Sequence, residues 1–398
     1  MTVSGQNRRL RRTGEQARRA RDFSPPQRAA MAEADGVGDW LVRLLPCAAV
    51  GLALIVFAGA LGYPFVDDDR LMVVNNPVLR SWTQVPQYFV EDAWGHSGPD
   101  AMSNYYRPAQ LLWLRLNYAW FDMSPGGYHA ASIALHALAT ALVFLVARRT
   151  LRDRLAAGFA ALIFAVHPIH VEPAVWISGA TESELAVFFL TAVLCYVVWR
   201  ECMYSAAKSA RWWLGFSLLA YALALLTKES AVLLGAMFVI YEWKWRPAGG
   251  RQDADGNRPM KPENPSEAQT AERIVDDQRS LVTRIASRML RVVLVLWPYG
   301  VVVAAYLAAR SYALRASPRA GSGASLTTIL LTLPQVFVFD LRKLLWPFPL
   351  SLFYPLQMVT RPHLANFVVP LAVSLAALAG LWIWSRRSEA VGWAWCGS

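Results

Sequence analysis

An acidic cluster directly follows an apolar run near the start of the chain. In FVDDDRLMVVNNP, residues 65–77, the carboxylates of Asp67, Asp68 and Asp69 come after a segment long enough to cross a membrane. Adjacent like charges repel one another, which tends to raise their pKa values. The cluster can therefore be a solvated loop end, a general base held at the membrane surface, or a set of ligands for a divalent metal.

A second polar group lies in HPIHVEPAVWISGATESE, residues 167–184, where Pro168 ends a predicted helix. The spacings of His167, His170 and Glu172 place their side chains around one helix terminus. A His-x-x-His pair with a carboxylate can supply zinc ligands. Because no fourth ligand is evident nearby, we favour a role in binding or orienting an anion and predict no metal site there.

Cations complete the set of candidates. Arg107 and Arg115 lie in YYRPAQLLWLRLNYAWF, residues 105–121, and two guanidinium groups can hold a phosphate by paired hydrogen bonds. Lys228 and Glu229 stand between two apolar runs. A charge at bilayer depth costs about 2.5–3.5 kcal/mol, so this pair either neutralises itself at a helical turn or has a function.

These groups together suit the transfer of a sugar from a polyprenyl phosphate. The chain of such a donor stays in the bilayer, so its phosphate lies at the depth of the headgroups. The leaving phosphate needs Arg, Lys or His to stabilise its developing charge, and the acceptor hydroxyl needs a carboxylate to take its proton. The expected partners are a polyprenyl-phosphate sugar donor, a protein or other hydroxyl acceptor, and membrane lipids.

The elements that must position these residues are membrane helices. The 398 residues are 55% hydrophobic and only 17% charged. Apolar runs of about 18 to 22 residues recur along the chain, and each can cross a hydrocarbon core. The sequence therefore predicts an all-α polytopic membrane protein. The net charge of +11 is concentrated between the apolar runs, so it does not indicate nucleic-acid binding.

The predicted spans number eight. They lie near residues 44–65, 127–147, 155–170, 184–199, 212–227, 230–243, 292–309 and 365–385. Basic segments alternate with them, which places both termini in the cytosol and the candidate residues outside. In the long first outer loop, the helix at 105–121 is expected to lie flat along the membrane surface. Residues 325–360 are predicted to form an amphipathic element in the outer interface.

The chain is predicted to have five parts. They are a disordered basic cytosolic arm at 1–40, a catalytic membrane core at 41–243, a flexible cytosolic loop at 244–290, C-terminal membrane helices with the interfacial segment at 291–387, and a tail at 388–398. Abundant Ala, Arg and Leu favour a bacterial inner membrane, with the site on the periplasmic face.

Six motifs, in order, resemble the family of transmembrane and tetratricopeptide-repeat-containing O-mannosyltransferases and their bacterial relatives. The motifs are FVDDDRLMVVNNP, DAWG, YYRP, RLNY, HPIHVEPAVWISGATE and LLTKES, and they span residues 63–243. The family belongs to the GT-C class of multispanning glycosyltransferases. The resemblance implies a GT-C membrane fold, mannose as the sugar, protein Ser or Thr as the acceptor, and an inverting mechanism.

The resemblance also implies roles for individual residues. The paired acids of the family fall on Asp68 and Asp69, and either would act as the base. The residues that match the family's other motifs are expected to bind the donor phosphate or the substrate: Tyr106, Arg107, His167, His170, Glu172, Glu182, Lys228 and Glu229. No cofactor is expected, and a divalent metal at Asp68 and Asp69 is the alternative.

Two departures from the family keep other functions open. Ala180 stands where the family usually has an arginine, and no part of these 398 residues matches its helical repeat domain. One alternative is a transporter or flippase of lipid-linked sugars. Transporters tend to carry inverted repeats with polar residues at the midplane, whereas here the polar groups gather at span ends and no repeat is visible. The other alternative is a degenerate scaffold that binds the donor without turnover.

Overall fold

The computed structural model describes residues 25–97, 103–205, 207–244, 267–314, 324–351, 354 and 356–396. Within these ranges the chain forms helices and turns, without a strand. The α-helices are α2 (Pro25–Phe57), α3 (Pro108–Phe121), α4 (Pro125–Leu151), α5 (Arg154–Val166), α6 (Val171–Val175), α7 (Thr181–Tyr204), α8 (Ala210–Thr227), α9 (Ala231–Leu234), α10 (Ala236–Lys244), α11 (Glu267–Ala313), α12 (Leu326–Leu345) and α13 (Val369–Cys396).

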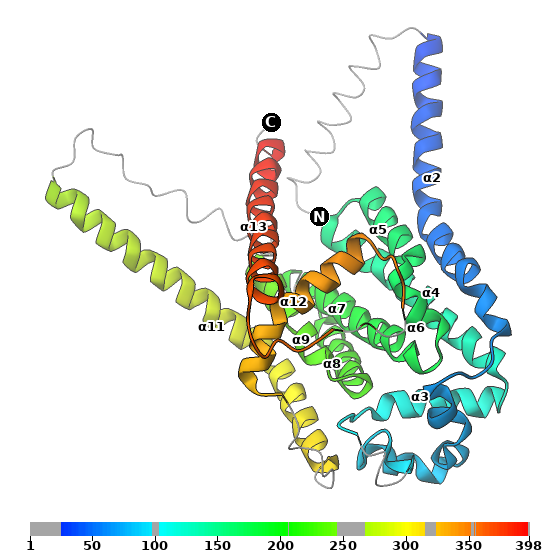
Figure 1. Ribbon diagram of the computed structural model, residues 1–398. Helices are drawn as coiled ribbons and strands as arrows, with labels where there is room; N and C mark the ends of the chain where they lie inside the picture. The colour runs from blue at the N-terminus through cyan, green and yellow to red at the C-terminus, as the bar shows by residue number, and fades with distance from the viewer. Residues whose placement is uncertain are drawn as a thin grey trace.

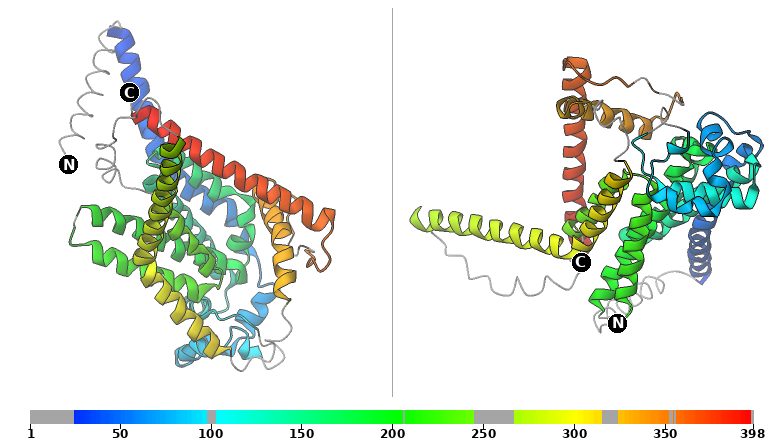
Figure 2. Two further views of the ribbon diagram at one scale, coloured as in Figure 1. Left: turned by 90° about the vertical axis from the view of Figure 1, so that its left-hand side faces the viewer. Right: turned by 90° about the horizontal axis from the view of Figure 1, so that it is seen from below.

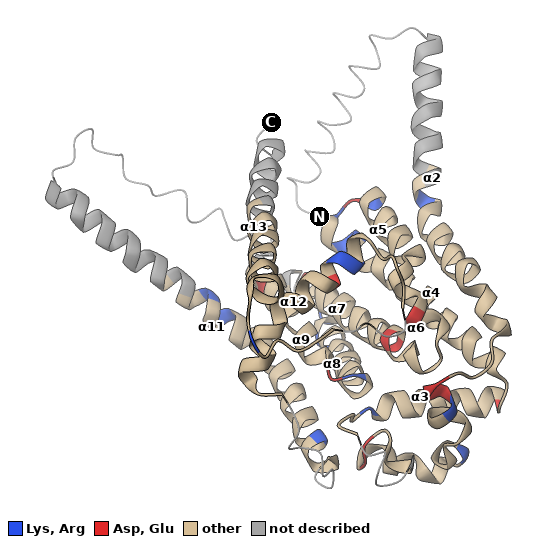
Figure 3. Ribbon diagram, viewed as in Figure 1, with Lys and Arg blue, Asp and Glu red and all other residues tan. Residues whose placement is uncertain are grey.

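Six helical segments in the described ranges are long and apolar enough to cross a membrane. They are Val42–Gly62, Pro125–Leu151, Ser178–Met203, Ala210–Thr227, Ala286–Ala313 and Leu364–Ile383. The prediction of an all-α polytopic membrane protein is thereby confirmed. Figure 3 shows the central lengths of α4, α7 and α8 free of charged positions, as a hydrocarbon environment requires.

Two of the eight predicted spans differ from this group. The third is a bent pair, Arg154–Val166 and Pro168–Val175, which counts as a seventh span if both parts cross together. The axis turns by 50° at the break, because Pro168 cannot continue the hydrogen-bond ladder of α5. The sixth is the shorter apolar helix Ala231–Trp243. At 1.5 Å per residue it reaches only about 20 Å, less than a hydrocarbon core.

The helices pack in two groups, with α4 and α7 in contact between them (Figure 1). In the first, α2, α4 and α5 meet through fully buried alanines, including Ala53, Ala157 and Ala161. Small residues let helix backbones approach closely, which is how membrane helices gain packing energy without a hydrophobic driving force. In the second, α7, α8, α10 and α11 surround a cluster of aromatic rings that includes Tyr196 and Tyr299.

The first long connection folds back onto α3. Short helical turns between residues 70 and 97 bury Met72, Leu79 and Tyr88 against Leu111 and Leu114. The predicted surface helix at 105–121 is therefore half buried under this connection, although Trp120 remains 64% exposed. Figure 2 shows the connection and α3 together at one end of the bundle.

The sequence suggested that Arg115 would be available to a phosphate beside Arg107, but the structure buries it. Its side chain is 5% exposed, and the guanidinium lies 4.2 Å from the centre of the Trp82 ring. Cation–π contacts with Trp82 and Tyr118 compensate part of its charge, while Nε and Nη1 are buried without a hydrogen-bond partner among the described residues. Arg115 therefore does not join Arg107 in a common phosphate site.

The remaining predicted parts overlap the described residues only in part. Residues 1–24 and 245–266 lie outside them, whereas α2 begins at Pro25, inside the predicted arm, and α11 begins at Glu267, inside the predicted loop. The predicted interfacial segment contains α12, which carries three charged residues near its end and is not among the candidate spans. It packs against α13 beside the bundle (Figure 2).

Candidate active site

Asp69 joins the first connection to the turn before α7. Its Oδ1 accepts hydrogen bonds from the Ser178 backbone N–H at 2.8 Å and from Ser178 Oγ at 2.6 Å. Its Oδ2 accepts from the Val66 N–H at 3.1 Å. The side chain has no solvent exposure, and this burial raises the pKa of Asp69 although the hydrogen bonds oppose the change. Both carboxylate oxygens of Asp69 are therefore occupied by structural contacts.

Asp68 points the other way and lines a cavity of about 240 Å³, the polar cavity. The chain turns at Asp67, whose φ of 46° lies in the left-handed region that Asp tolerates better than most residues. Partial burial raises the pKa of Asp68, and repulsion from Asp67 and Asp69 adds to the effect. Of the two predicted acids, Asp68 alone faces a space where a substrate could bind.

Arg107 reaches the polar cavity from the start of α3 and is paired with Glu229. Its Nη2 donates to Glu229 Oε1 at 2.9 Å and its Nε to Oε2 at 3.2 Å, the geometry of a bidentate ion pair. The guanidinium also lies 4.2 Å from the centre of the Tyr105 ring. Burial opposes the charge of Glu229, yet the hydrogen bonds and charge of Arg107 hold the pKa of Glu229 below its usual value.

The opposite wall of the polar cavity carries three more of the predicted residues. Lys228, directly after α8, forms a salt bridge with Glu182 in the first turn of α7. Glu172 of α6 lines the same space, near enough to both for electrostatic interaction. Five predicted residues from five separate elements thus line one cavity: Asp68, Arg107, Glu172, Glu182 and Lys228.

Gly179 allows the turn before α7 to approach α6. A Cβ at this position would lie 2.9 Å from the carbonyl oxygen of Glu172 and 3.2 Å from the Trp176 ring. Both contacts are shorter than real Cβ atoms ordinarily make. The absence of a side chain at Gly179 therefore sets the distance between Ser178 and Glu172 on the cavity wall.

Five of the ten predicted residues do not line the polar cavity. Asp69 and Glu229 are held by Ser178 and Arg107, as described above, and the other three lie elsewhere. His170 packs its ring on Phe164, with centroids 4.2 Å apart. His167 accepts from the Ile169 N–H at Nδ1, so its Nε2 carries the proton and donates to the Leu344 carbonyl at 3.0 Å. Tyr106 is 1% exposed and donates to the Phe89 carbonyl at 3.1 Å. His170 and Glu172 lie two residues apart in the helical segment Pro168–Val175, so their side chains leave it in different directions.

Several residues of the cavity wall were not singled out from the sequence. These residues lie in or near the motifs, but their spacing does not distinguish them from residues that only support the fold. They are Trp94, Tyr105, Gln110, Trp176 and Ser178. Gln110 donates to the Ser178 carbonyl at 3.5 Å, which links α3 to the turn before α7. Aromatic side chains beside charged groups are typical of sugar- and lipid-binding surfaces at the headgroup zone.

The absence of a metal, with a divalent ion at Asp68 and Asp69 as the alternative, stays a prediction. Among the described residues, no group of three or more His, Cys, Asp or Glu side chains is arranged to hold an ion. Both Asp69 oxygens accept hydrogen bonds from the protein, and His167 uses both ring nitrogens. Asp69 and His167 thus have partners within the protein, whereas the carboxylate of Asp68 faces the polar cavity.

The fold and site define an integral membrane protein with a cavity of acids and bases at one end of its helix bundle. Residues 105–246 match the family described as dolichyl-phosphate-mannose-protein mannosyltransferase. The chain is 32% identical over 206 residues to the protein O-mannosyl-transferase TMTC2 of Mus musculus, covering 51% of this chain and 24% of the relative. It is 36% identical over 157 residues to Tmtc1 of Drosophila melanogaster, covering 39% and 18%.

A third relative is the protein O-mannosyl-transferase F38B6.6 of Caenorhabditis elegans, 33% identical over 156 residues, which are 38% of this chain and 23% of the relative. The chain thus covers a quarter or less of the length of each of these three relatives. No solved structure matches it. The predicted resemblance to O-mannosyltransferases is confirmed.

Proposed function

We propose that this protein is a GT-C-type glycosyltransferase that moves a sugar, mannose by its resemblance, from a polyprenyl phosphate to a hydroxyl group, with protein Ser or Thr as the acceptor. The observation that carries the proposal is the meeting of Asp68, Arg107 and Lys228 at one cavity. A carboxylate and two cations are the groups that this reaction needs. The names of the related proteins and of the matched family point to the same activity.

The reaction requires one proton transfer and one displacement. Asp68 accepts the proton of the acceptor hydroxyl as the oxygen attacks the anomeric carbon. The bond from that carbon to the phosphate oxygen breaks, and its electron pair leaves with the polyprenyl phosphate. Attack opposite the leaving group inverts the anomeric centre. Arg107 and Lys228 stabilise the charge that develops on the phosphate.

The carboxylates that pair with these cations take part in donor binding. Glu229 holds the Arg107 guanidinium in one orientation, and Glu182 does the same for the Lys228 ammonium. A phosphate that binds either cation replaces or shares its carboxylate partner. Glu172, close to Lys228, lies where it can accept hydrogen bonds from sugar hydroxyls.

The polar cavity is assigned to the non-cytosolic side of the membrane. Its residues come from the connections that follow α2, α6 and α8 and from the start of α3. The opposite ends of the bundle helices carry basic residues, including Arg148 and Arg149 at the end of α4 and Arg211 at the start of α8. By the positive-inside rule those ends are cytosolic. In a bacterium the cavity would then face the periplasm.

Purified protein in lipid nanodiscs, supplied with polyprenyl-phosphate mannose and a Ser/Thr-containing peptide, tests the proposal. Wild-type protein is expected to form mannosylated peptide, and Asp68→Asn to lower the rate at least about 100-fold, the scale of general-base catalysis. Asp67→Asn serves as the adjacent control, since Asp67 does not line the cavity. An unchanged rate in Asp68→Asn would remove the base assignment. Donor translocation without glycopeptide would favour the transporter alternative.

A further inference from the structure

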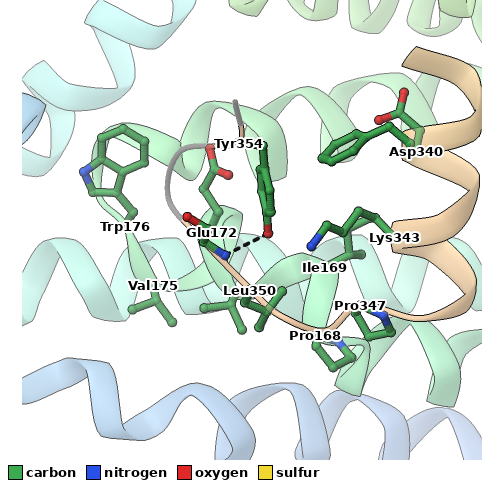
Figure 4. Close-up of a pocket in the computed structure, with 13 residues that line it drawn as sticks. Pro168, Ile169, Glu172, Val175, Trp176, Asp340, Lys343, Pro347, Leu350 and Tyr354 are labelled. Carbon is green, nitrogen blue, oxygen red and sulfur yellow. Dashed lines mark hydrogen bonds between the residues drawn. The ribbon is translucent and has the colours of Figure 1, made fainter. Parts of the chain in front are cut away.

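The wall of the polar cavity that α6, α7 and the end of α8 form carries several glutamates. Glu172 lines both the polar cavity and a second cavity of about 510 Å³ between α6 and α12. We call the second one the apolar cavity, because side chains such as Val175 and Leu350 form most of its lining (Figure 4). Glu182 is paired with Lys228. Both acids therefore have a place in the proposed site.

Glu184 faces neither cavity, and no cation of the described residues pairs with it. It lies in the first turn of α7, inside the membrane-spanning segment Ser178–Met203, and is 3% exposed. Its Oε2 is buried without a hydrogen-bond partner in the described part of the chain. An ionisable side chain inside a membrane protein is costly to bury, so its presence points to a function.

The partner of Glu184 is Thr227, the last residue of α8. The two side chains lie within hydrogen-bonding reach, and Thr227 is fully buried. The Thr227 hydroxyl donates its one proton to the Leu223 carbonyl at 2.9 Å. The hydroxyl oxygen can then only accept, so Glu184 is the donor, and a carboxyl group donates only when it is protonated.

The burial of Glu184 favours the same protonation state. The N-terminus of α7 attracts an anion, but this attraction is smaller than the cost of burying a charge without a partner. Glu184 is therefore a neutral acid. Glu182, two residues earlier, is ionised because Lys228 matches its charge.

Thr227 lies directly before Lys228, at the point where α8 ends. Lys228 leaves the helix with an extended backbone, φ −155° and ψ 138°, so the end of α8 determines where its side chain begins. Two links join α7 to this point: the Glu182–Lys228 salt bridge and the neutral Glu184–Thr227 hydrogen bond. A phosphate competes for the first link because it binds a cation. It does not compete for the second, which is neutral and buried.

We propose that Glu184 is a positioning residue for Lys228. As a neutral acid it donates to Thr227 and holds the end of α8 against α7 while Lys228 exchanges Glu182 for the phosphate of the donor. The role of Lys228 in this exchange rests on the proposed function. Since Ala180 stands where the related family usually has an arginine, this wall of the polar cavity depends on Lys228 for its positive charge.

Direct binding of polyprenyl-phosphate mannose to the full chain in nanodiscs, without an acceptor, tests the positioning role. Glu184→Leu removes the donated hydrogen bond, and the Kd should rise about three- to tenfold, the scale of one lost hydrogen bond. Glu184→Gln should restore wild-type affinity, because its amide N–H can donate to Thr227. Glu201→Leu, at an exposed glutamate near the other end of α7, is the matched control and should not change the Kd.

The effect of Glu184 is expected to act through Lys228. In a Lys228→Gln background, Glu184→Leu should cause no further loss of affinity, whereas a general effect on the fold would add to that of Lys228→Gln. If Glu184→Leu does not fold, Thr227→Val removes the acceptor of the same hydrogen bond and takes its place. Wild-type affinity in Glu184→Leu, equal weakening by Glu184→Gln, or additive losses with Lys228→Gln would overturn the proposal.

Infrared difference spectroscopy tests the protonation state without any donor. The difference between the wild type and Glu184→Gln at neutral pH should contain the C=O band of a protonated carboxyl group. A carboxylate band in its place would overturn the neutral hydrogen bond. Wild-type protein that binds the donor without transferring the sugar would refute the proposed reaction and leave the role of Glu184 intact. Wild-type protein that does not bind the donor would overturn both.

Discussion

The carboxylate of Asp69 accepts two hydrogen bonds from Ser178, 109 residues further along the chain, while its neighbour Asp68 faces the polar cavity. This pairing ties the first connection to the turn before α7 and fixes the position of Asp68. Adjacent carboxylates thus have different tasks, one structural and one proposed to be catalytic.

Asp69→Asn should therefore act mainly on stability. The amide can replace only one carboxylate oxygen as an acceptor, so either Ser178 or the Val66 N–H loses its partner. An unsatisfied buried donor costs about 1–3 kcal/mol, and we expect thermal unfolding in detergent at a lower temperature. Asp67→Asn, at an exposed side chain, should unfold like the wild type. Equal stability of all three proteins would contradict the structural role of Asp69.

The Arg107–Glu229 pair predicts measurable coupling between α3 and the segment after α8. Its bidentate geometry favours a stronger interaction than the usual surface pair, although the Glu229 side chain is 35% exposed. A double-mutant cycle with Arg107→Met and Glu229→Gln should give a coupling energy near the upper end of surface pairs, about 1 kcal/mol. Strict additivity of the two unfolding free energies would show that the pair contributes nothing.

The pH dependence of transfer should report on Asp68. A general base must be ionised, and burial together with repulsion from Asp67 and Asp69 raises the pKa of Asp68. The rate should therefore fall on acidification at a higher pH than for an ordinary aspartate. Asp67→Asn removes one repelling charge, so the acidic limb of the kcat/KM profile should move to lower pH. A limb that stays in place, or moves upward, would exclude Asp68 as the titrating base.

Gly179→Ala should disturb the cavity wall. The new methyl would lie 2.9 Å from the Glu172 carbonyl oxygen, so the turn or α6 must shift. Overpacking of this kind costs about 1–3 kcal/mol, and it should also raise the KM for the donor. Gly215→Ala in α8 meets nothing within 4 Å and should be neutral or slightly stabilising. If both variants unfold at the same temperature, the close approach at Gly179 is not required.

Five charged residues could be predicted to lie together, because each follows or precedes a span at the same face of the membrane. They are Asp68, Arg107, Glu172, Glu182 and Lys228. The alternation of basic segments predicts which ends of the spans share that face. The order of the six motifs supports the expectation that distant segments meet there. Side-chain direction was less predictable. The side chains of Asp68 and Asp69 point in different directions because the backbone turns at Asp67. Three consecutive acidic residues in a sequence do not reveal such a turn.

The histidines and Lys343 show what the pattern could not determine. His167 and His170 share a motif with Glu172, but their rings lie against the Leu344 carbonyl and the Phe164 ring and not in the polar cavity. Lys343 lies in an otherwise apolar segment of the sequence. Its environment depends on α12 folding back against α6, a contact between segments about 170 residues apart that local periodicity does not encode.

The two cavities draw on different lengths of nascent chain. Every residue of the polar cavity precedes Glu229, whereas the apolar cavity needs residues up to Tyr354. Since membrane helices are inserted in order of synthesis, the acid–base groups can assemble while more than a hundred residues remain to be translated. A ribosome stalled near residue 320 would thus hold a chain that has every residue lining the polar cavity and has not yet made α12, which lines the cavity beside it.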